Sequence, residues 1–373
     1  LFTMNIGDLI APYVGLKPGE KPLLDSVHQS TNGVTIFRMN VRRFQIPSHE
    51  GAYTVYFTRE NYNTAEPMQS ATAIAGFYNA KYFYEMVDYA KINMAVGAFK
   101  EGLKIDDEGK EFPLFIAHRY GGEPDVQHSL TVEQLYQVAT ELSKLHIFCF
   151  TDKSPETRRT LNENHTIIKK FHSDKFANDL FITLRAFTNE FARFFKKPAK
   201  IPEMIGSLYK DADDLGYVNL LSEQLWQPQV LCHGELTADK LVFDNNGKLL
   251  EIRDWDSVHY GSIAEDLSFL IITSSSTDIR RNHFMSVFRH YYYPLVGHVR
   301  TSFKLVALKE SFRKLHKFAV LSSMPLLMRA LVSEISDQQK EERAQRWESA
   351  VEDTLDFERA DYESDNEDAF FSK

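Results

Sequence analysis

Apolar residues recur at helical spacing over most of the chain beyond residue 129. The clearest case is the segment 130–146, where apolar side chains share one face at spacings of three, three, one, three and three. They are Val132, Leu135, Val138, Ala139, Leu142 and Leu145. Ser129 or Thr131 can cap this helix. Further helices are predicted over 174–226, which holds two or three of them, and over 263–274, 277–293 and 303–328.

The first third of the chain has a different pattern, in which short runs alternate apolar and polar residues. The run Ala52–Thr58 alternates and is rich in β-branched and aromatic residues, as expected for a strand. Three or four such runs and one helix near Gly76–Glu85 are predicted over 31–115, while prolines make 1–30 irregular. The pattern as a whole predicts an α+β chain with a small β-rich part at 1–118, a larger helical part at 119–357 and an acidic, disordered tail at 358–373.

Composition narrows the function classes. A hydrophobic share of 43%, with 28 Phe and 17 Tyr, supports a sizeable core. The formal net charge of -9 argues against non-specific nucleic-acid binding, which needs a basic face. Two cysteines, Cys149 and Cys232, indicate a reducing compartment, and both are expected to be buried thiols. We find neither a charged-then-apolar leader nor an apolar run near the ~18 residues of a membrane span, and we expect a cytoplasmic protein.

The residues that carry chemistry concentrate in the segment 228–256. Histidine, glycine and an acid stand at 233–235, a hairpin with Asn246-Gly247 at its tip follows, and a second acid, Asp254, comes after it. Phosphoryl transfer needs a carboxylate beside the acceptor hydroxyl and oxygen ligands for Mg²⁺. The loop supplies one carboxylate and the hairpin delivers another, although an ordinary β-hairpin with charged residues shows the same local pattern.

This segment resembles the CHK kinase-like, or ecdysteroid-kinase-like, family, which is related to choline kinases and aminoglycoside phosphotransferases. The matching residues are Leu231-Cys232-His233-Gly234, Asp254-Trp255, Gly261, Asp266-Leu267 and the helix 130–146. The resemblance implies a protein-kinase-like fold with two lobes, a small β-rich N-lobe and a large helical C-lobe. It also implies ATP and Mg²⁺ as cofactors and a sterol-like or choline-like hydroxyl as acceptor. In related kinases a hinge binds the adenine through its backbone, and His118, Arg119 and Tyr120 stand at that place.

The chain departs from the family at two decisive positions. Glu235 stands where the family has its catalytic aspartate, which moves the carboxylate by roughly 1 Å and can cost about 100-fold in rate. Lys240 stands where the family has a metal-binding asparagine, and an ammonium has three donors and no acceptor. Asp239 could turn inward instead, or Lys240 could pair with a phosphate and replace one metal.

The N-terminal part departs as well. A kinase holds the nucleotide phosphates with a strand lysine that pairs with a glutamate on the next helix. Here Tyr56 stands at the lysine position, with Arg59 the nearest cation, and Lys81 stands at the glutamate position, with Glu85 one turn later. Neither a Gly-x-Gly-x-x-Gly sequence nor a Walker sequence occurs.

Two features outside the motif, a histidine and a run of tyrosines, could have a functional role, but ordinary core packing explains both. His146, at the end of the helix 130–146, is better explained as a core or surface histidine than as a catalytic one. The run Tyr291–Tyr293 could line an aromatic box for a quaternary ammonium, but consecutive helical residues point about 100° apart. Core packing is therefore the favoured interpretation.

Three functional interpretations stay open. The first is a catalytically degenerate kinase-like protein that binds a small molecule or nucleotide at most. The second is an active small-molecule kinase with Glu235 as base, Asp254 on Mg²⁺ and Asp239 or Asp256 as the second metal contact. The third is a protein-interaction module that uses the acidic tail and an unknown partner. We predict that Asp254 and Glu235 face one cleft within roughly 10 Å. We also predict that Lys240 forms an ion pair with Asp254, Asp239 or Glu235.

Overall fold

The computed structural model describes residues 23–31, 34–42, 51–58, 67–96, 99–105, 111–119, 128–151, 155–208 and 225–359, with side chains for 71–96, 128–151, 156–169, 183–208 and 225–359. The chain forms two compact units, each made of segments that are not contiguous in sequence. The first unit contains 1–127, 147–171 and 239–260, and the second contains the rest. Arg59, Tyr120 and the tail beyond Arg359 lie outside the described residues.

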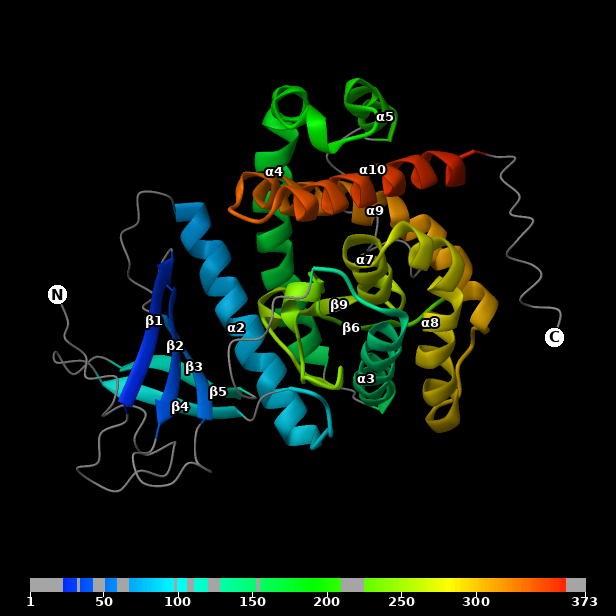
Figure 1. Cartoon of the computed structure of the whole chain (residues 1–373). Helices are drawn as coiled ribbons and strands as arrows, with labels where there is room; N and C mark the ends of the chain where they lie inside the picture. The colour runs from blue at the N-terminus through cyan, green and yellow to red at the C-terminus, as the bar shows by residue number, and fades with distance from the viewer. Residues whose placement is uncertain are drawn as a thin grey trace. The chain divides into compact units, whose positions relative to one another are not determined.

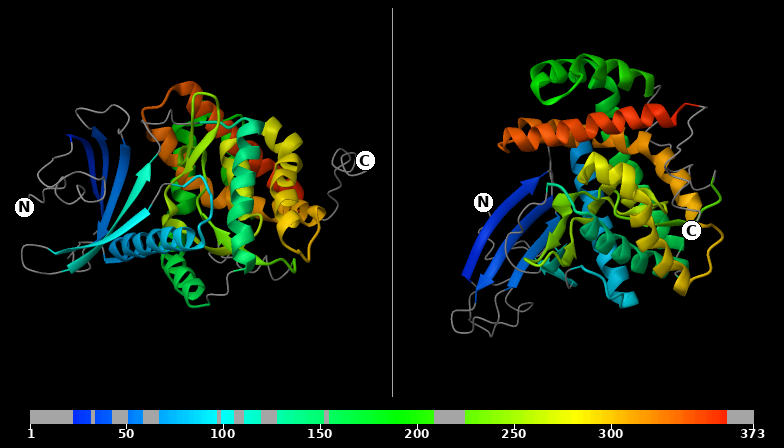
Figure 2. Two further views of the ribbon diagram at one scale, coloured as in Figure 1. Left: turned by 90° about the horizontal axis from the view of Figure 1, so that it is seen from below. Right: turned by 45° about the vertical axis from the view of Figure 1, so that its right-hand side comes forward.

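The first unit contains a five-stranded antiparallel sheet with the strand order β1-β2-β3-β5-β4 (Figure 1). The strands are β1 (Leu23–Thr31), β2 (Val34–Arg42), β3 (Gly51–Thr58), β4 (Phe99–Ile105) and β5 (Glu111–Arg119). Helix α2 (Pro67–Ala90) packs against strands β2, β3 and β4 (Figure 2). The predicted strand at 52–58 is confirmed as β3.

One prediction for this region was wrong. Residues 1–30 were expected to be irregular, but β1 begins directly after Pro22. Proline only removes a donor at its own position, so an edge strand can start immediately after it. The prediction of three or four strands over 31–115 is confirmed, because β2, β3, β4 and β5 lie or begin there.

The predicted hairpin is confirmed in the first unit. The 3-10 turn η5 (Ala238–Lys240) leads into β7 (Leu241–Phe243), which pairs antiparallel with β8 (Leu249–Ile252). Gly247 has a φ of 76°, which an L-residue adopts rarely, and the Asp244 carboxylate accepts from two backbone N–H groups of the turn. The turn η6 (Trp255–Ser257) and strand β9 (His259–Ser262) follow.

The second unit is mostly helical. Helices α3 (Val132–Thr151) and α4 (Pro155–Glu190) each cross the boundary between the units along the chain, whereas the described helices after α4 lie in the second unit. These are α5 (Ile201–Leu208), α7 (Glu265–Ser274), α8 (Thr277–His298), α9 (Leu305–Val332) and α10 (Asp337–Phe357), with the 3-10 turns η2 (Ala192–Phe194) and η3 (Pro198–Lys200) and strand β6 (Gln229–Cys232). Helix α9 contacts both α7 and α10.

The predicted apolar face of α3 is confirmed, because Leu135, Val138, Ala139, Leu142 and Leu145 are all buried. Its cap is Thr131, whose hydroxyl accepts from the Gln134 N–H at 3.2 Å while the Gln134 side chain accepts from the Thr131 N–H at 3.0 Å. The cap and the buried face together explain why the helix begins where it does.

Some helices are longer than their patterns predicted. Helix α4 begins at Pro155, well before the expected 174. Helix α8 continues past Pro294 to His298, because the buried Leu295 stabilises a last turn that has lost one backbone hydrogen bond. By length and composition α9 could cross a membrane, but 61% of its apolar window is buried, as in a core helix.

Candidate functional site

The loop after β6 is shaped by one buried carboxylate of the second unit. Asp266, in the first turn of α7, accepts from the backbone N–H of His233 at 2.7 Å and from that of Gly234 at 3.0 Å. Gly234 has a φ of 88°, a conformation that costs a side chain-bearing residue about 1 kcal/mol or more. The backbone of the predicted catalytic loop is therefore held in one conformation by groups other than its reactive side chains.

Glu235 projects from this braced loop. Its side chain is 42% exposed and one carboxylate oxygen lies 3.8 Å from the Arg329 guanidinium on α9. An exposed pair of this kind contributes about 0–1 kcal/mol, so Arg329 affects the local charge more than the stability. The sequence pattern pointed to neither Arg329 nor the bracing role of Asp266, since both act through tertiary contacts with distant segments.

His146 is a core histidine, as the sequence favoured. Its Nε2 donates to the Leu231 carbonyl at 3.1 Å, so Nδ1 accepts from the Tyr291 hydroxyl at 2.7 Å. Burial lowers the pKa of His146 to about 3, although the Leu231 carbonyl opposes this shift. Tyr291 is fully buried, whereas Tyr293 is 61% exposed, so the tyrosine run does not form one aromatic box.

In the first unit, the hairpin brings Lys240 and Asp254 together. The Lys240 Nζ donates to an Asp254 carboxylate oxygen at 3.0 Å, and the two side chains are 24% and 23% exposed. Burial opposes the charge on Lys240, but the carboxylates of Asp254, Asp239 and Asp256 outweigh it and raise the pKa of the ammonium. The predicted ion pair is confirmed, with Asp254 as the partner.

The turn that carries Asp254 is held by helix α2. Asp254 itself has the left-handed φ of 61°, which is uncommon outside glycine. The neighbouring Trp255 is buried and stacks on Phe83 of α2 with ring centroids 3.8 Å apart. Gly76 of the same helix allows a close approach, because a Cβ there would lie 3.2 Å from the Asp256 Cβ. These contacts hold the turn that carries Asp254 and Asp256 against helix α2.

The fold resemblance implies Mg²⁺ at these acids, but the residues present do not fit it. A divalent ion needs oxygen ligands. At the position where the family has an asparagine, Lys240 supplies an ammonium in place of a carboxamide oxygen. That ammonium already donates a hydrogen bond to one carboxylate oxygen of Asp254. Asp239 and Asp256 are both exposed. Their carboxylates are not part of the Lys240–Asp254 ion pair.

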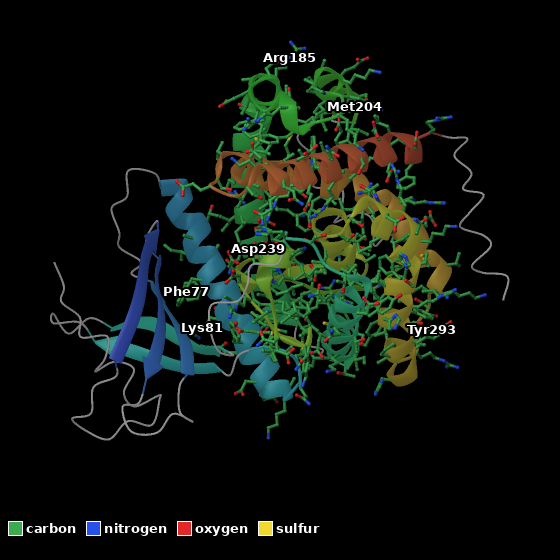
Figure 3. All side chains as sticks on the ribbon, in the orientation of Figure 1. Phe77, Lys81, Arg185, Met204, Asp239 and Tyr293 are labelled. Carbon is green, nitrogen blue, oxygen red and sulfur yellow. The ribbon has the colours of Figure 1, made fainter. Side chains whose placement is uncertain are left out.

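Helix α2 carries a second lysine–acid pair. Lys81, which is labelled on this helix in Figure 3, forms a hydrogen-bonded ion pair with Glu85 one turn later. The Lys81 side chain is only 12% exposed. Tyr56 lies inside the sheet, opposite Ile36 and Phe115. A lysine–glutamate ion pair is therefore present, but both of its residues lie on helix α2. In a kinase the lysine would lie on a strand and the glutamate on the helix.

The remaining candidate positions are only partly described. His118 and Arg119 end strand β5, paired in register with Tyr53 and Ala52 of β3, and their role as a hinge stays a prediction. Tyr120 lies outside the described residues. Glu235 and Asp254 belong to different units, and the prediction that they face one cleft also stays a prediction.

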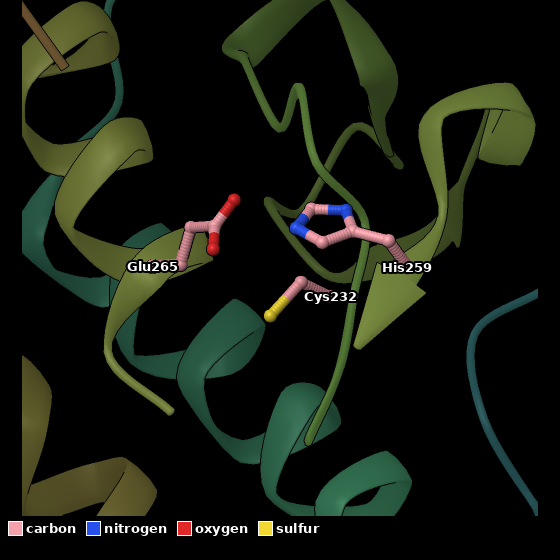
Figure 4. A group of neighbouring side chains, drawn as sticks. All are labelled: Cys232, His259 and Glu265. Carbon is pink, nitrogen blue, oxygen red and sulfur yellow. The ribbon is translucent and has the colours of Figure 1, made fainter. Parts of the chain in front are cut away.

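The cysteines are both free thiols. Figure 4 shows Cys232 at the end of β6, Glu265 at the first position of α7 and His259 at the start of β9. Cys232 is buried as expected, and its thiol donates to the Ser262 carbonyl at 3.3 Å. The expectation for Cys149 was wrong, because it is only partly buried in the last turn of α3, where the buried face has already ended.

Comparisons with known proteins agree with this architecture. A spectinomycin phosphotransferase, APH(9)-Ia, solved with ADP and spectinomycin, has a TM-score of 0.51 and 14% identity, covering 96% of this chain and 99% of that chain. The choline kinase LicA from Streptococcus pneumoniae has a TM-score of 0.42 and 13% identity, with 93% and 97% covered, a similarity that supports no further conclusion.

Sequence relatives point the same way. The "Uncharacterized kinase-like protein D1044.1" of Caenorhabditis elegans is 28% identical over 131 residues, 34% of this chain and 35% of that protein, so the match spans about a third of the relative's length. The family model DUF1679, described as "Uncharacterized oxidoreductase dhs-27", matches residues 123–358. The chain has a kinase-like phosphotransferase fold of the α+β class, and it belongs to the DUF1679 family.

Proposed function

We propose that this protein is a catalytically degenerate member of the kinase-like phosphotransferase group, which retains small-molecule or nucleotide binding at most. The observation that carries this proposal is the ion pair between the Lys240 ammonium and the Asp254 carboxylate at 3.0 Å. A metal–phosphate complex would have to displace that ammonium before it could reach Asp254. Preorganised phosphate or metal contacts are worth about 2–4 kcal/mol each, so their loss removes most of the affinity for Mg²⁺–ATP.

The retained parts of the fold favour ligand binding over a purely structural role. Asp266 still holds the loop that presents Glu235, although structural stability alone does not require an exposed acid there. The ligand class, a nucleotide, is suggested by the relative that was solved with ADP. The proposal includes an adenine-binding hinge at His118, Arg119 and Tyr120. It also includes an N-lobe that ends at 118, a C-lobe that ends at 357, and a cytoplasmic location.

The second candidate is an active ATP-dependent kinase of a small-molecule hydroxyl, with Glu235 as the base. The exposed Glu235 carboxylate on its braced loop is the observation that favours it. This candidate requires Lys240 to leave Asp254. An oxidoreductase activity has less support, because the dinucleotide-binding Gly-x-Gly-x-x-Gly signature is absent from this sequence.

Thermal unfolding with ATP, with and without Mg²⁺, separates the two candidates. Binding stabilises by about RT ln(1 + [L]/Kd), so a retained site gives a measurable shift at millimolar ATP. We expect a small shift, or none, that a chelator leaves unchanged. A shift of several degrees that disappears with the chelator, together with ATP turnover that Asp254→Ala abolishes, would establish the active kinase instead.

Restoring the motif is the complementary test. The double replacement Glu235→Asp with Lys240→Asn rebuilds the base and the oxygen ligand together. Residues that act as a unit are strongly non-additive, so we expect the double variant to gain more Mg²⁺-dependent ATP binding than either single variant. A double variant without any gain would place the loss in the N-terminal part, where Tyr56 and Lys81 stand at the lysine and glutamate positions.

A further inference from the structure

The N-terminal half of helix α9 is basic in a chain that is acidic overall. Five basic residues and a single acid lie over 304–317, although the whole chain has a formal net charge of -9. The basic residues are Lys304, Lys309, Arg313, Lys314 and Lys317, and the acid is Glu310. All of the basic residues except Lys309 are exposed or half-buried. Val306, Arg313 and Lys317 follow one another at spacings of seven and four, so they share one side of the helix.

Two exposed apolar side chains lie at the N-terminal end of this helix. Trp226 is 88% exposed, and Val306 is 56% exposed. The residue after Trp226, Gln227, is buried against α9. Its amide nitrogen donates to the Ala307 carbonyl at 3.3 Å, and its oxygen accepts from the Ser311 hydroxyl at 2.9 Å. Trp226 and Val306, together with the exposed and half-buried cations of 304–317, are called the α9 face below.

The tryptophan is fixed in this exposed position. Trp226 has a left-handed φ of 54°, a conformation that a bulky residue holds only where its surroundings enforce it. The two hydrogen bonds of Gln227 to α9 supply that constraint. Backbone strain that keeps a large aromatic side chain in solvent points to a role for that side chain outside the core.

The described part of the chain ends beside the α9 face. Helix α10 packs against α9 (Figure 1). Near the end of α10, the Phe357 ring lies edge-on to the His316 ring at 4.8 Å and 5.9 Å from the Arg313 guanidinium. From Arg313 back to Val306 the helix extends about 10 Å, whereas the fourteen residues of 360–373 can span up to about 45 Å. That segment can therefore reach the whole face.

The segment 360–373 lies outside the described residues, but its composition complements the face. It contains five acids and one basic residue. The acids are Asp361, Glu363, Asp365, Glu367 and Asp368, and the basic residue is Lys373. Phe370 and Phe371 follow the acids. A chain that leaves α10 near Arg313 and runs towards Val306 therefore presents its acids to the cations first and its aromatic rings to the apolar end afterwards.

We propose that the segment 360–373 binds the α9 face of its own chain. Its acids pair with the cations of the face, and Phe370 and Phe371 lie against Trp226. Exposed ion pairs are individually weak, but attachment to the same chain supplies an effective concentration in the millimolar range, and several weak contacts then act together. The proposal does not depend on the proposed function, because none of these residues belongs to the loop at Glu235 or to the hairpin that carries Lys240.

The chain carries its own reporter for this contact. Of its three tryptophans, Trp255 and Trp347 are buried, so quenching of the fluorescence by acrylamide reports mainly on Trp226. We expect weaker quenching of the native protein at about 20 mM salt than at about 0.5 M salt, because the higher concentration screens exposed charges. Trp226→Phe should remove this dependence on salt.

Two full-chain variants remove the contact from opposite sides. One replaces the five acids of 360–373 by their amides, and the other is Lys304→Gln with Lys317→Gln. Each should raise the quenching at low salt to the level of the native protein at high salt, and their combination should add nothing further, since both remove the same contact. Lys196→Gln with Lys200→Gln is the matched control, because it removes two exposed lysines of the same unit outside α9 and should leave the quenching unchanged.

The outcomes separate this contact from its alternatives. Protection of Trp226 that is lost in either variant and is the same at all protein concentrations supports the proposal. Quenching that responds neither to salt nor to the variants would overturn it, as would two effects that add up, because the variants would then act through separate contacts. Protection that grows with protein concentration would assign the segment to a second copy of the chain and would also overturn it.

Discussion

Two buried histidines should make the protein lose stability in mild acid. Burial lowers the pKa of His146 from 6.5 to about 3, and it does the same to His316, where the Arg280 charge adds to the effect. Both rings are therefore neutral in the folded state, while the unfolded chain takes up a proton at each histidine below pH 6.5. Because the unfolded state binds more protons, the free energy of unfolding falls as the pH drops from 6.5 towards 3.

The magnitude follows from the size of the shift. One pKa unit corresponds to about 1.4 kcal/mol, so lowering the pH from 7.5 to 5.0 costs about 2 kcal/mol for each histidine. That is a large part of a total stability of about 5–15 kcal/mol. The lowered pKa of Asp353 adds nothing in this window, because its contribution is lost only below the ordinary range of a carboxyl.

His146→Gln isolates one of the two contributions. Glutamine can still donate to the Leu231 carbonyl, but it does not titrate. Urea unfolding at pH 7.5 and 5.0 should show the native protein losing about 2 kcal/mol more between these pH values than the variant does. Equal losses, within about 0.5 kcal/mol, would show that His146 accepts a proton inside the folded protein and would refute the reasoning.

Three further substitutions test the packing around the site. Asp266→Asn replaces one of the two oxygens that each accept from a backbone N–H with an amino group, and should lower stability by about 1–3 kcal/mol, with faster hydrogen exchange in the loop; unchanged protection would argue against the bracing role. Asp353→Ala leaves the buried Arg280 without its carboxylate and should cost about 3–5 kcal/mol in urea unfolding, whereas an apolar replacement of both should recover most of it. Phe83→Ala removes the ring stacked on Trp255 and should cost about 3–5 kcal/mol with a loss of near-ultraviolet dichroism, and a loss below about 1 kcal/mol would contradict that packing.

Local patterns predicted local structure well. The apolar face of α3 was visible because burial repeats with the helical period. The Lys240–Asp254 pair was predictable because both residues flank a hairpin, whose pairing brings its two ends together. In both cases the information lies within a short stretch of chain.

Contacts between distant segments could not be predicted in this way. Nothing near Glu235 indicates that Arg329 of α9 lies beside it, and nothing near the loop indicates that Asp266 accepts its N–H groups. Prolines were overestimated as breakers, since β1 starts after Pro22 and α8 passes through Pro294. Tertiary packing overrode the local signal at each of these positions.

The two hydrogen bonds that the loop backbone donates to the Asp266 carboxylate, here called the Asp266 bracket, have an evolutionary consequence. The bracket binds main-chain N–H groups of His233 and Gly234, which every non-proline residue possesses, and so it does not depend on which side chain follows at 235. Mutations at the reactive position are therefore tolerated by the fold, and selection on folding alone does not remove them. A lineage can lose or exchange its chemistry here while the loop keeps its shape, so the same bracket would still be in place if a later substitution brought the chemistry back.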